Sequence, residues 1–472
     1  MSLDNRRGKF VLAFGLSLIA GILLSYSLMD RSYYVLFAVA AVLFNLSVMK
    51  LRMLPLVLIL LIIPFVDWAV EYRFLPFQIM WLPELMSLLL FVKALIYKMS
   101  EKQRFKTVGL RYALLLLAVG LLSLVFNKSG MIPALLFLRL LFRYYLLFLA
   151  IINLDFYEKL LRRINKVVIF IFLIQLPLSI VKLAIFGQGE TSLSLSSHSL
   201  STIFPLIAIS FLFSFYFLYK KQIAYVLGIF GFVGLSVIGG KRAFIFYLPI
   251  LLAYLIWLIK RDTGLKPSVI FAAALVLVVS FYFAARLVPT LNPQREIWGD
   301  FNLKHIIDYA VSYETYVSMT GMPTGRISST VEIYDSLKKR GILGFSLGYG
   351  PGTIVKSIFS DYDRRDAIRE RFGIEYGLNG MSWLAVQVGY LGMGIYILIF
   401  YVVLRKAYLY FLIEQDPYWH SFALGMVGFC FILIVTCLFY TPFFNDDSVA
   451  AFYFYLAAVV VLKKEQHEMD RA

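Results

Sequence analysis

The sequence predicts an all-α polytopic membrane protein with about 12 to 14 transmembrane helices and one large extracytoplasmic helical loop. Of its 472 residues, 61% are hydrophobic and only 15% are charged, whereas roughly 25% of an ordinary soluble domain is charged. Apolar windows of about 20 residues, long enough to cross a hydrocarbon core of roughly 30 Å, recur along the chain. Cations gather in alternate loops between these windows, a distribution that is typical of polytopic proteins.

The apolar windows define the expected spans. The first window follows the segment MSLDNRRGK and has no small-residue cleavage site at its end. It is therefore expected to remain as a span and not to be removed as a signal peptide. We read about fourteen windows, which cover residues 9–29, 33–49, 53–70, 78–97, 109–126, 132–152, 166–186, 202–219, 223–239, 243–259, 267–288, 382–404, 420–440 and 448–462.

These windows divide the chain into three regions. Residues 1–288 form the expected N-terminal transmembrane bundle of about 11 spans. Residues 382–472 form the expected C-terminal transmembrane helices and a short cytoplasmic tail. The polar stretch between them, 289–381, is too long to be a mere connector and is expected to be a large loop.

Three segments of the loop have a local pattern of their own. GRISSTVEIYDSLKKR (325–340) and DYDRRDAIRERF (361–372) are expected to be helical, and GILGFSLGYGPGT (341–353) is expected to be a glycine-rich turn between them. The loop is therefore predicted to form a small helical cap on the outer membrane surface.

The positions of the cations set the orientation of the chain. If the N-terminus is cytoplasmic, every inner segment is basic, from Arg6 and Arg7 to the tail with Lys463 and Lys464. The short outer segments hold few cations, so the positive-inside rule places both termini in the cytoplasm and the large loop outside. The net charge of +17 then reflects cytoplasmic loops held against anionic lipid, and no nucleic-acid partner is expected.

The cysteines and histidines give no sign of a metal or cofactor. Cys430 and Cys437 are seven residues apart in one apolar window and are expected to pack on one helix face, because a bridge at that spacing within a helix is geometrically implausible. The four histidines are scattered and form no cluster with cysteine, so the sequence offers no metal ligand set.

Two arginines stand inside an expected span, where a charge costs about 2.5 to 3.5 kcal/mol on insertion scales. Arg139 and Arg143 are four residues apart and should share one helical face. They could clamp a polyanion, because guanidinium binds phosphate oxygens with two parallel hydrogen bonds. Alternatively, they form structural ion pairs with carboxylates from other helices. Glu84, near the outer end of its span, is either interfacial or such a partner.

A second cationic pair opens the span at 243–259. Lys241 and Arg242 follow two glycines, in a topology whose short outer segments otherwise carry few cations. At the N-terminus of a helix, the helix dipole adds to the attraction for an anion. The pair is therefore a candidate anion site facing outward, or else an ordinary interfacial anchor.

Three stretches resemble the O-antigen ligase and polymerase superfamily of bacterial envelopes. They are SVIGGKRAFIFYLPIL, TGRISSTVEIYDSLKKRGILGFSLGYGPG and LNGMSWLAVQVGYLGMGIYILIF, and the resemblance is best over about residues 230–400. Position by position, the resemblance places Arg242 on the arginine of the first motif, with Lys241 in place of its common serine. Gly325 and Arg326 match the loop's Gly-Arg step. The glycine turn is matched by Gly348 and Gly350, and the closing step by Gly389 and Gly392.

The closing motif departs from the ligase branch of the family. A histidine usually precedes an asparagine there, whereas this chain has Leu378 and Asn379. The ligase-type general base is absent at that position. The resemblance therefore favours the polymerase branch, with the ligase as the alternative.

By resemblance, the donor is a glycan on undecaprenyl pyrophosphate at the outer face of the bacterial cytoplasmic membrane, and the glycan moves to an acceptor sugar hydroxyl. Cations stabilise the charge on the leaving pyrophosphate without a metal. The candidate cations are Arg139, Arg143, Lys241, Arg242 and Arg326, with Gly348 and Gly350 as further substrate-binding positions. Membrane lipid, a chain-length regulator and a flippase of the same pathway are the expected partners.

The acceptor hydroxyl needs a base within hydrogen-bond reach. Glu375 is the candidate for that role, with Glu332 and Asp335 as rivals that could equally be exposed helix charges. The loop tyrosines could serve as sugar platforms or as interfacial anchors; these are Tyr309, Tyr313, Tyr316 and Tyr349.

Two other classes of protein fit part of the pattern. A lipid-linked glycan flippase would also have many spans and internal cations, but it should show two repeat halves and no large one-sided loop. A structural or regulatory membrane protein is the remaining alternative. The long loop and the lack of visible repeats favour the enzyme.

Overall fold

The structure is a computed structural model, and it describes residues 82–154, 156–186, 200–238, 242–263, 275, 278–279, 281–283, 285–296, 298–317, 322, 324–354, 364–374, 378–440 and 447–471. The expected spans at 9–29, 33–49 and 53–70 lie outside these residues. The regular elements of the described residues are helices, so the all-α class is confirmed there.

The chain divides into two compact units. The first comprises residues 1–106, 143–171 and 195–197, and the second comprises residues 107–142, 172–194 and 198–472. Helix α8 (Glu158–Phe186) begins in the first unit and ends in the second.

In the first unit, helix α4 (Leu82–Ser100) packs against helix α7 (Tyr145–Asn153). Met86, Leu90 and Ala94 recur every four residues and are buried on one side of α4, which is the helical spacing of an apolar stripe. The side chain of Asn153, fully buried, donates to the carbonyl of Lys106 over 2.9 Å and accepts from its backbone N–H over 2.7 Å. These bonds tie the end of α7 to the loop after α4.

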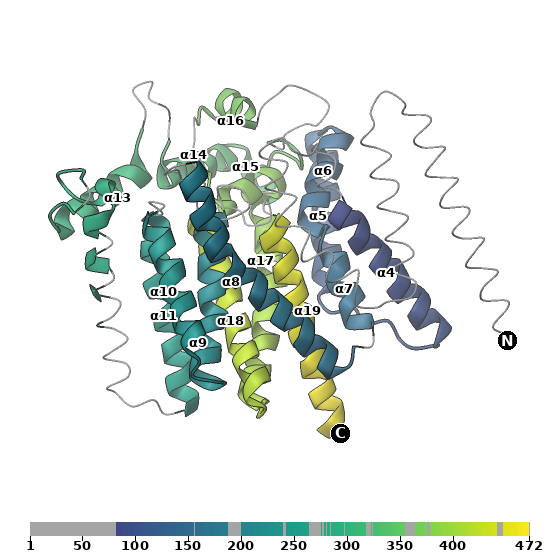
Figure 1. Cartoon of the computed structure of the whole chain (residues 1–472). Coiled ribbons are helices and arrows are strands. Elements are labelled where there is room, and N and C mark those ends of the chain that lie inside the picture. Colours follow the sequence, from purple (N-terminus) through teal and green to yellow (C-terminus); the bar gives the residue numbers. More distant parts are fainter. Residues whose placement is uncertain are drawn as a thin grey trace, which may run out of the picture. The chain divides into compact units, whose positions relative to one another are not determined.

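The second unit is a helical bundle built around α18 (Pro417–Phe439), which packs against α9, α11, α17 and α19 (Figure 1). The other helices of the bundle are α5 (Leu110–Asn127), α6 (Met131–Phe142), α9 (Leu200–Leu218), α10 (Ile223–Ile238), α11 (Arg242–Thr263), α17 (Gly380–Ile413) and α19 (Asp447–Arg471).

Small residues let α9 and α18 approach closely. Ser210 of α9 donates to the carbonyl of Gly425 over 2.9 Å, and a side chain at Gly425 would meet the ring of Phe211 at 2.5 Å. Small side chains at a contact of this kind are typical of helix packing in membranes. Cys430 and Cys437 are both buried free cysteines in the same helix α18, as their spacing predicts.

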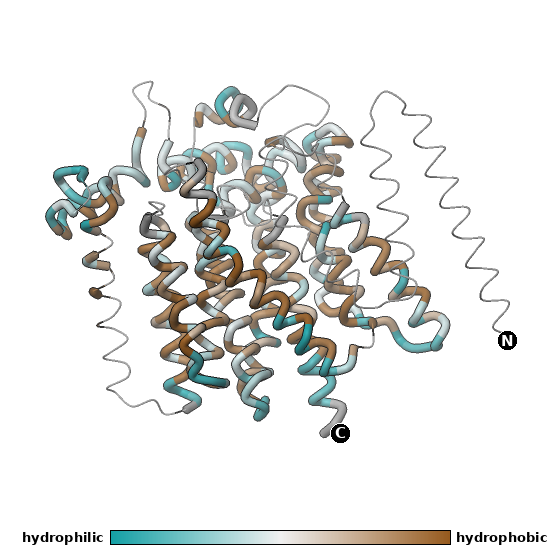
Figure 2. Tube along the Cα trace, viewed as in Figure 1, coloured by the Kyte–Doolittle hydropathy of each residue, from teal (hydrophilic) through white to brown (hydrophobic). Residues whose placement is uncertain are grey.

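Several helices have the length and composition of membrane spans. Among the described residues, five are long and apolar enough to cross a membrane, and α6 with α7 adds a sixth if the pair is one span. Hydrophobic residues line the middle of these helices and hydrophilic residues collect at their ends (Figure 2). The chain thus has the character of a membrane protein, with fewer spans described than the about 12 to 14 predicted.

The expected span at 132–152 is not one continuous helix. Helix α6 ends at Phe142 and α7 begins at Tyr145, with a turn at Arg143 and Tyr144. The prediction that Arg139 and Arg143 share one helical face is therefore wrong. The turn coincides with an ion pair made by Arg143, described below.

The loop region contains η2 (Pro289–Leu291), α13 (Leu303–Thr315), α14 (Arg326–Lys339), α15 (Gly341–Leu347) and α16 (Arg364–Phe372). Helices α14 and α16 lie within the two segments predicted to be helical. Residues 341–347, predicted as part of a turn, instead form α15. In α15, the ring of Phe345 stacks on the ring of Tyr390 of α17, and the ring centroids are 4.4 Å apart. This packing stabilises a helix in a segment whose glycines alone would favour a turn.

Helix α17 is interrupted at Gly389, which has φ 69° and ψ 177°. That conformation is essentially limited to glycine. A Cβ on Gly389 would overlap the carbonyl oxygen of Ser346, and a Cβ on Gly348 would lie 2.6 Å from the carbonyl oxygen of Val386. The backbone N–H of Tyr349 donates to that same carbonyl over 2.6 Å. The break in α17 is thus where the backbone after α15 docks.

Candidate functional site

The start of α14 brings Arg326 beside the end of α13. The backbone N–H groups of Thr324 and Gly325 both donate to the carbonyl of Tyr316, the C-cap of α13, over 3.0 Å. A Cβ on Gly325 would overlap the backbone of Glu314. Only glycine allows the two helix ends to meet this closely, and the next residue, Arg326, is placed next to Glu314 as a result.

Arg326 forms an ion pair in a half-buried setting. Its Nη1 donates to Oε1 of Glu314 over 2.8 Å, and the side chains of Arg326 and Glu314 are 20% and 29% exposed. Burial works to lower the pKa of Arg326, but the Glu314 carboxylate, with nearby Tyr440 and Tyr313, outweighs burial and holds that pKa above its ordinary value. The guanidinium is therefore a permanent charge.

Aromatic rings from other helices surround this guanidinium. Its central carbon lies 4.6 Å from the ring centroid of Tyr440, the C-cap of α18, and 5.9 Å from that of Tyr313 of α13. The ring of Tyr247, on α11, lies 6.0 Å from the ring of Tyr440. A cation against the face of a tyrosine is electrostatically favourable.

Five helices contribute to this one polar group. The hydroxyl of Thr202, on α9, lies 3.3 Å from the hydroxyl of Tyr440 and joins it to the fifth helix. We call the group the Arg326 cluster; it consists of Thr202, Tyr247, Tyr313, Glu314, Arg326 and Tyr440.

One turn after Arg326, α14 is fastened to α17. Asn379, the N-cap of α17, accepts from the backbone N–H of Ser382 over 2.8 Å and donates to the hydroxyl of Thr330 over 3.0 Å. The hydroxyls of Thr330 and Ser382 lie 2.9 Å apart. Asn379 is the asparagine that the resemblance placed at the histidine-asparagine position. In the structure it caps α17 and links this helix to α14.

Asn379→Ala is expected to lower the free energy of unfolding by about 1 to 3 kcal/mol, because it removes a helix cap and a buried hydrogen bond. Asn379→Asp keeps the acceptor that caps α17 and loses the donor to Thr330, so it should cost less. Thermal unfolding of the purified protein measures both. Equal midpoints for the wild type and Asn379→Ala would contradict this role.

A second polar network holds the turn after α15. Arg340 donates to the carbonyl of Gly348 and to Oδ1 of Asn127, each over 2.8 Å, and its guanidinium lies 4.3 Å from the ring centroid of Tyr349. A Cβ on Gly350 would overlap Oγ of Ser129. In the structure, Gly348 and Gly350, predicted as substrate-binding positions, thus serve close backbone packing, and Arg340 fixes the turn that contains them.

Arg143 lies in the first unit, where its Nη1 is 3.7 Å from Oε1 of Glu84. Its side chain is 5% exposed and that of Glu84 is 13% exposed. This is the structural ion pair that the sequence analysis gave as the alternative to a polyanion clamp. A buried arginine needs such a carboxylate to compensate its charge. Arg139 lies in α6 of the second unit.

Some of the remaining predicted site residues lie on helices of the structure, and others lie outside the described residues. Arg242 is the first residue of α11, five residues before Tyr247, and its side chain is outside the described residues. Lys241 and Glu375 also lie outside the described residues. Asp335 is exposed on α14, and Glu332 is half-buried there.

The sequence alone did not point to four members of the Arg326 cluster, which are Thr202, Tyr247, Glu314 and Tyr440. Glu314 precedes Arg326 by 12 residues, and Tyr440 follows it by more than a hundred. Tyr247 looks like any tyrosine within an apolar window. The one available signal was the position of Tyr247 and Tyr440. Each stands near the end of an apolar window, and the predicted topology puts both of these ends on the same side.

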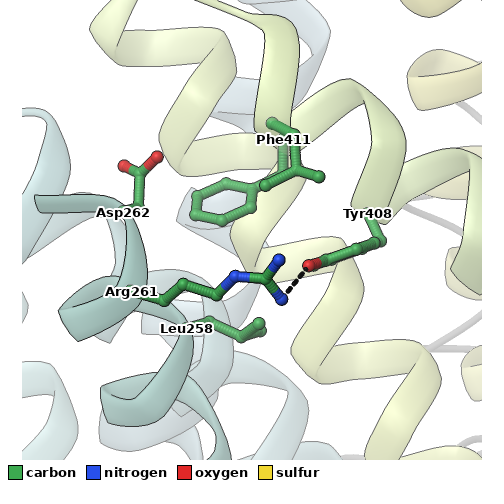
Figure 3. Close-up of a pocket in the computed structure, with 6 residues that line it drawn as sticks. Leu258, Arg261, Asp262, Tyr408 and Phe411 are labelled. Carbon is green, nitrogen blue, oxygen red and sulfur yellow. Dashed lines mark hydrogen bonds between the residues drawn. The ribbon is translucent and has the colours of Figure 1, made fainter.

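The other end of α11 holds a cavity of about 140 Å³ lined by Leu258, Arg261, Asp262, Tyr408, Phe411 and Leu412 (Figure 3). Arg261 donates to the hydroxyl of Tyr408 over 2.8 Å, and Asp262 lies 3.2 Å from Nε2 of His420. Arg261 is 14 residues beyond Tyr247, which is about 21 Å along a helix. The cavity and the Arg326 cluster are therefore separate.

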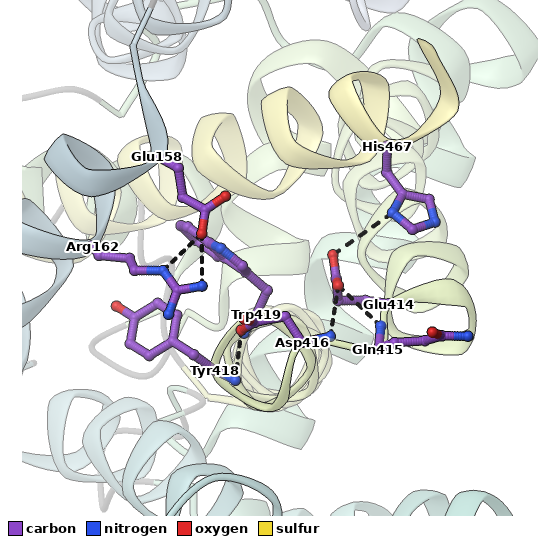
Figure 4. Close-up of polar contacts among 8 residues, drawn as sticks. All are labelled: Glu158, Arg162, Glu414, Gln415, Asp416, Tyr418, Trp419 and His467. Atoms are coloured by element: carbon purple, nitrogen blue, oxygen red, sulfur yellow. Dashed lines mark hydrogen bonds and ion pairs between the residues drawn. The ribbon is translucent and has the colours of Figure 1, made fainter. Parts of the chain in front are cut away.

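The turn between α17 and α18 lies at this same end of the bundle. Glu414 accepts from the backbone N–H groups of Gln415 and Asp416, and Asp416 in turn caps α18 by accepting from Tyr418 over 2.9 Å (Figure 4). His467 of α19 lies 4.0 Å from Glu414. The bonds accepted by Glu414 and Asp416 satisfy backbone donors at the start of a helix, which accounts for both carboxylates in structural terms.

No protein-family model matches the chain, and no characterised protein matches its sequence. The choice between the two polar ends therefore rests on chemistry. The Arg326 cluster places a permanent cation against the rings of Tyr313 and Tyr440, whereas in the cavity at the other end Arg261 donates to the hydroxyl of Tyr408 and Asp262 lies beside His420.

Proposed function

We propose that the chain is a polysaccharide or O-antigen polymerase-like glycosyltransferase. It moves glycan repeat units from an undecaprenyl pyrophosphate donor to an acceptor sugar at the outer face of the bacterial cytoplasmic membrane. The observation that carries the proposal is the Arg326 cluster, a half-buried guanidinium held by Glu314 among tyrosines at the ends of apolar helices. Both termini are cytoplasmic in this proposal, and the loop faces outward.

The transfer of a glycan from pyrophosphate requires positive charge beside the leaving pyrophosphate oxygen. As the bond between the anomeric carbon and the pyrophosphate oxygen breaks, its electron pair stays on that oxygen, and a fixed guanidinium stabilises the charge that develops. Arg326 supplies this charge without proton transfer, because guanidinium stays protonated. Glu314 holds Arg326 in orientation. Arg242, which opens α11 near Tyr247, is the second proposed cation.

The tyrosines suit the remainder of the substrate. A tyrosine ring offers an apolar face to a sugar and a polar tip for hydrogen bonding, and Tyr313 is 42% exposed. The proposed general base for the acceptor hydroxyl is Glu375, with Glu332 and Asp335 as rivals. The base removes the hydroxyl proton as the oxygen attacks the anomeric carbon.

Deletion of the gene, followed by electrophoresis of cell-surface glycans, tests the proposal. Loss of a polymerase should leave single repeat units on the surface and no ladder of longer chains. Restoring the wild-type gene should restore the ladder, and a gene carrying Arg326→Ala should fail to do so at equal protein level in the membrane.

The alternatives give different products. Loss of an O-antigen ligase leaves full-length polymer on its lipid carrier. Loss of a lipid-linked glycan flippase leaves the repeat unit out of reach of a glycosidase added to spheroplasts. An unchanged ladder in the deletion strain would refute the glycan polymerase assignment.

A further inference from the structure

Helix α13 carries an apolar stripe that the described residues leave uncovered. Leu303, Ile307 and Val311 recur every four residues and are 53%, 53% and 56% exposed. Lys304, Asp308 and Ser312 occupy the adjacent polar face and are exposed as well. An apolar stripe beside a charged face is the pattern of a helix that lies at a membrane surface.

The other side of α13 docks on the end of a membrane span. Ile306 is 1% exposed, in a cluster with Ile245 of α11 and with Ala285, Val288 and Leu291. The apolar span of α11 covers Ala243–Asp262, so Ile245 is its third residue. Because α13 touches the span at that point, α13 lies at the level where hydrocarbon gives way to lipid headgroups.

Exposed aromatic residues also lie in the segment that precedes α13. Trp298 is 54% exposed and Phe283 is 43% exposed, and their rings lie 6.2 Å apart. The rings of Tyr282 and Phe301 are also in contact, at 5.2 Å. Arg286 lies 5.8 Å from the rings of both Tyr282 and Trp298. Aromatic rings with a neighbouring cation are enriched at the boundary between membrane and water.

We propose that α13 is an interfacial helix whose stripe of Leu303, Ile307 and Val311 is immersed in the headgroup boundary of the lipid bilayer. The bilayer is the occupant that the surroundings favour. Phe301, two residues before the stripe, is exposed and lies against the ring of Tyr282. Val278, Val279, Tyr282 and Phe283 are exposed as well, and they belong to the apolar window that precedes α13 in the chain.

This immersion sets the depth of the Arg326 cluster. Tyr313 and Glu314 lie on the same helix as the stripe and both contact the guanidinium of Arg326. A helix fixed at headgroup depth therefore holds that cation beside the phosphate layer. The inference requires only that the bundle spans a membrane, and it stands independently of glycan transfer.

Spin-label accessibility tests the inference in the full-length protein. Cys430 and Cys437 are first replaced by alanine, and cysteines for nitroxide labelling are then introduced one at a time. One series is Leu303→Cys, Ile307→Cys and Val311→Cys; the matched series is Lys304→Cys, Asp308→Cys and Ser312→Cys. Each protein is placed in nanodiscs of phosphatidylethanolamine and phosphatidylglycerol. Collision rates with oxygen, which partitions into lipid, and with a water-soluble nickel chelate are then measured.

The first series should collide mainly with oxygen and the second mainly with nickel, so that the logarithm of their ratio changes sign between the two. Nickel accessibility throughout would overturn the inference, as would protection of the stripe from both reagents. The latter would indicate a protein partner or a second copy. Brominated lipid gives an independent check without labels: it should quench the wild type more than Trp298→Phe, and equal quenching of the two would also count against immersion.

Discussion

Gly389→Ala is expected to lower the free energy of unfolding by about 2 to 6 kcal/mol. The break in α17 needs φ 69° with ψ 177° at this position, which a residue with a Cβ rarely adopts. A Cβ would also overlap the carbonyl of Ser346, and that atom belongs to backbone, which cannot rotate away as a side chain can. Relief requires α15 to leave α17.

Gly394→Ala is the matched control for this prediction. It lies five residues further along the same helix, and a Cβ there would meet nothing within 4 Å. Alanine should therefore be neutral or stabilising by up to about 1 kcal/mol, because it favours helix more than glycine does. Thermal unfolding and the yield of monodisperse protein measure both variants. Similar midpoints for Gly389→Ala and Gly394→Ala would show that α17 does not need its break.

The second large effect is expected at the ion pair of Glu314 and Arg326. Arg326→Gln should reduce glycan transfer by about 10² to 10³-fold if the guanidinium stabilises the leaving pyrophosphate. It also leaves the carboxylate of Glu314 without its partner, at a cost of about 1 to 3 kcal/mol in stability. The single variant therefore mixes a loss of chemistry with a loss of folding.

Combining Glu314→Gln with Arg326→Gln separates the two contributions. The double variant has no unpaired charge, so its thermal midpoint should return close to that of the wild type. Its activity should stay low, because the cation is still missing. Lys304→Gln removes one positive charge from the exposed face of the neighbouring helix α13 and is expected to retain full activity.

Recovery of activity in the double variant would reverse the conclusion. In that case Arg326 would serve only to compensate Glu314, and the substrate would have to bind elsewhere. Arg326→Lys adds a further measurement. It keeps the charge but loses the two-pronged geometry that suits phosphate, so a phosphate-binding role predicts a marked loss of transfer in a folded protein.

The sequence was a good guide to elements whose pattern is local. Helix α14 begins at Arg326, within the predicted helical segment, and helices α9, α10 and α11 lie on their apolar windows. Burying an apolar stripe and ending a helix depend on neighbours in sequence, so hydropathy and glycine positions suffice to predict them.

Features made by distant segments were not predictable in the same way. Arg340 donates hydrogen bonds to Gly348 and to Asn127, and Asn127 is 213 residues away from Arg340 in the sequence. No periodicity indicates such a contact. Similarly, the turn at Arg143 interrupts a window that is apolar enough to continue as helix. Arg326 itself was found through its resemblance to a family motif, while its partner Glu314 emerged only with the fold.

The bond between Asn379 and Thr330 has a consequence for exchanging parts between related chains. It fastens helix α14 to the first turn of α17, which is long and apolar enough to cross a membrane, and the turn after α15 docks on the break at Gly389 a little further along. The loop and the opening turns of α17 therefore form one structural unit, whose two parts have to be exchanged together. A chimera that takes residues 289–381 from another sequence should fold only when residues 382–392 travel with them.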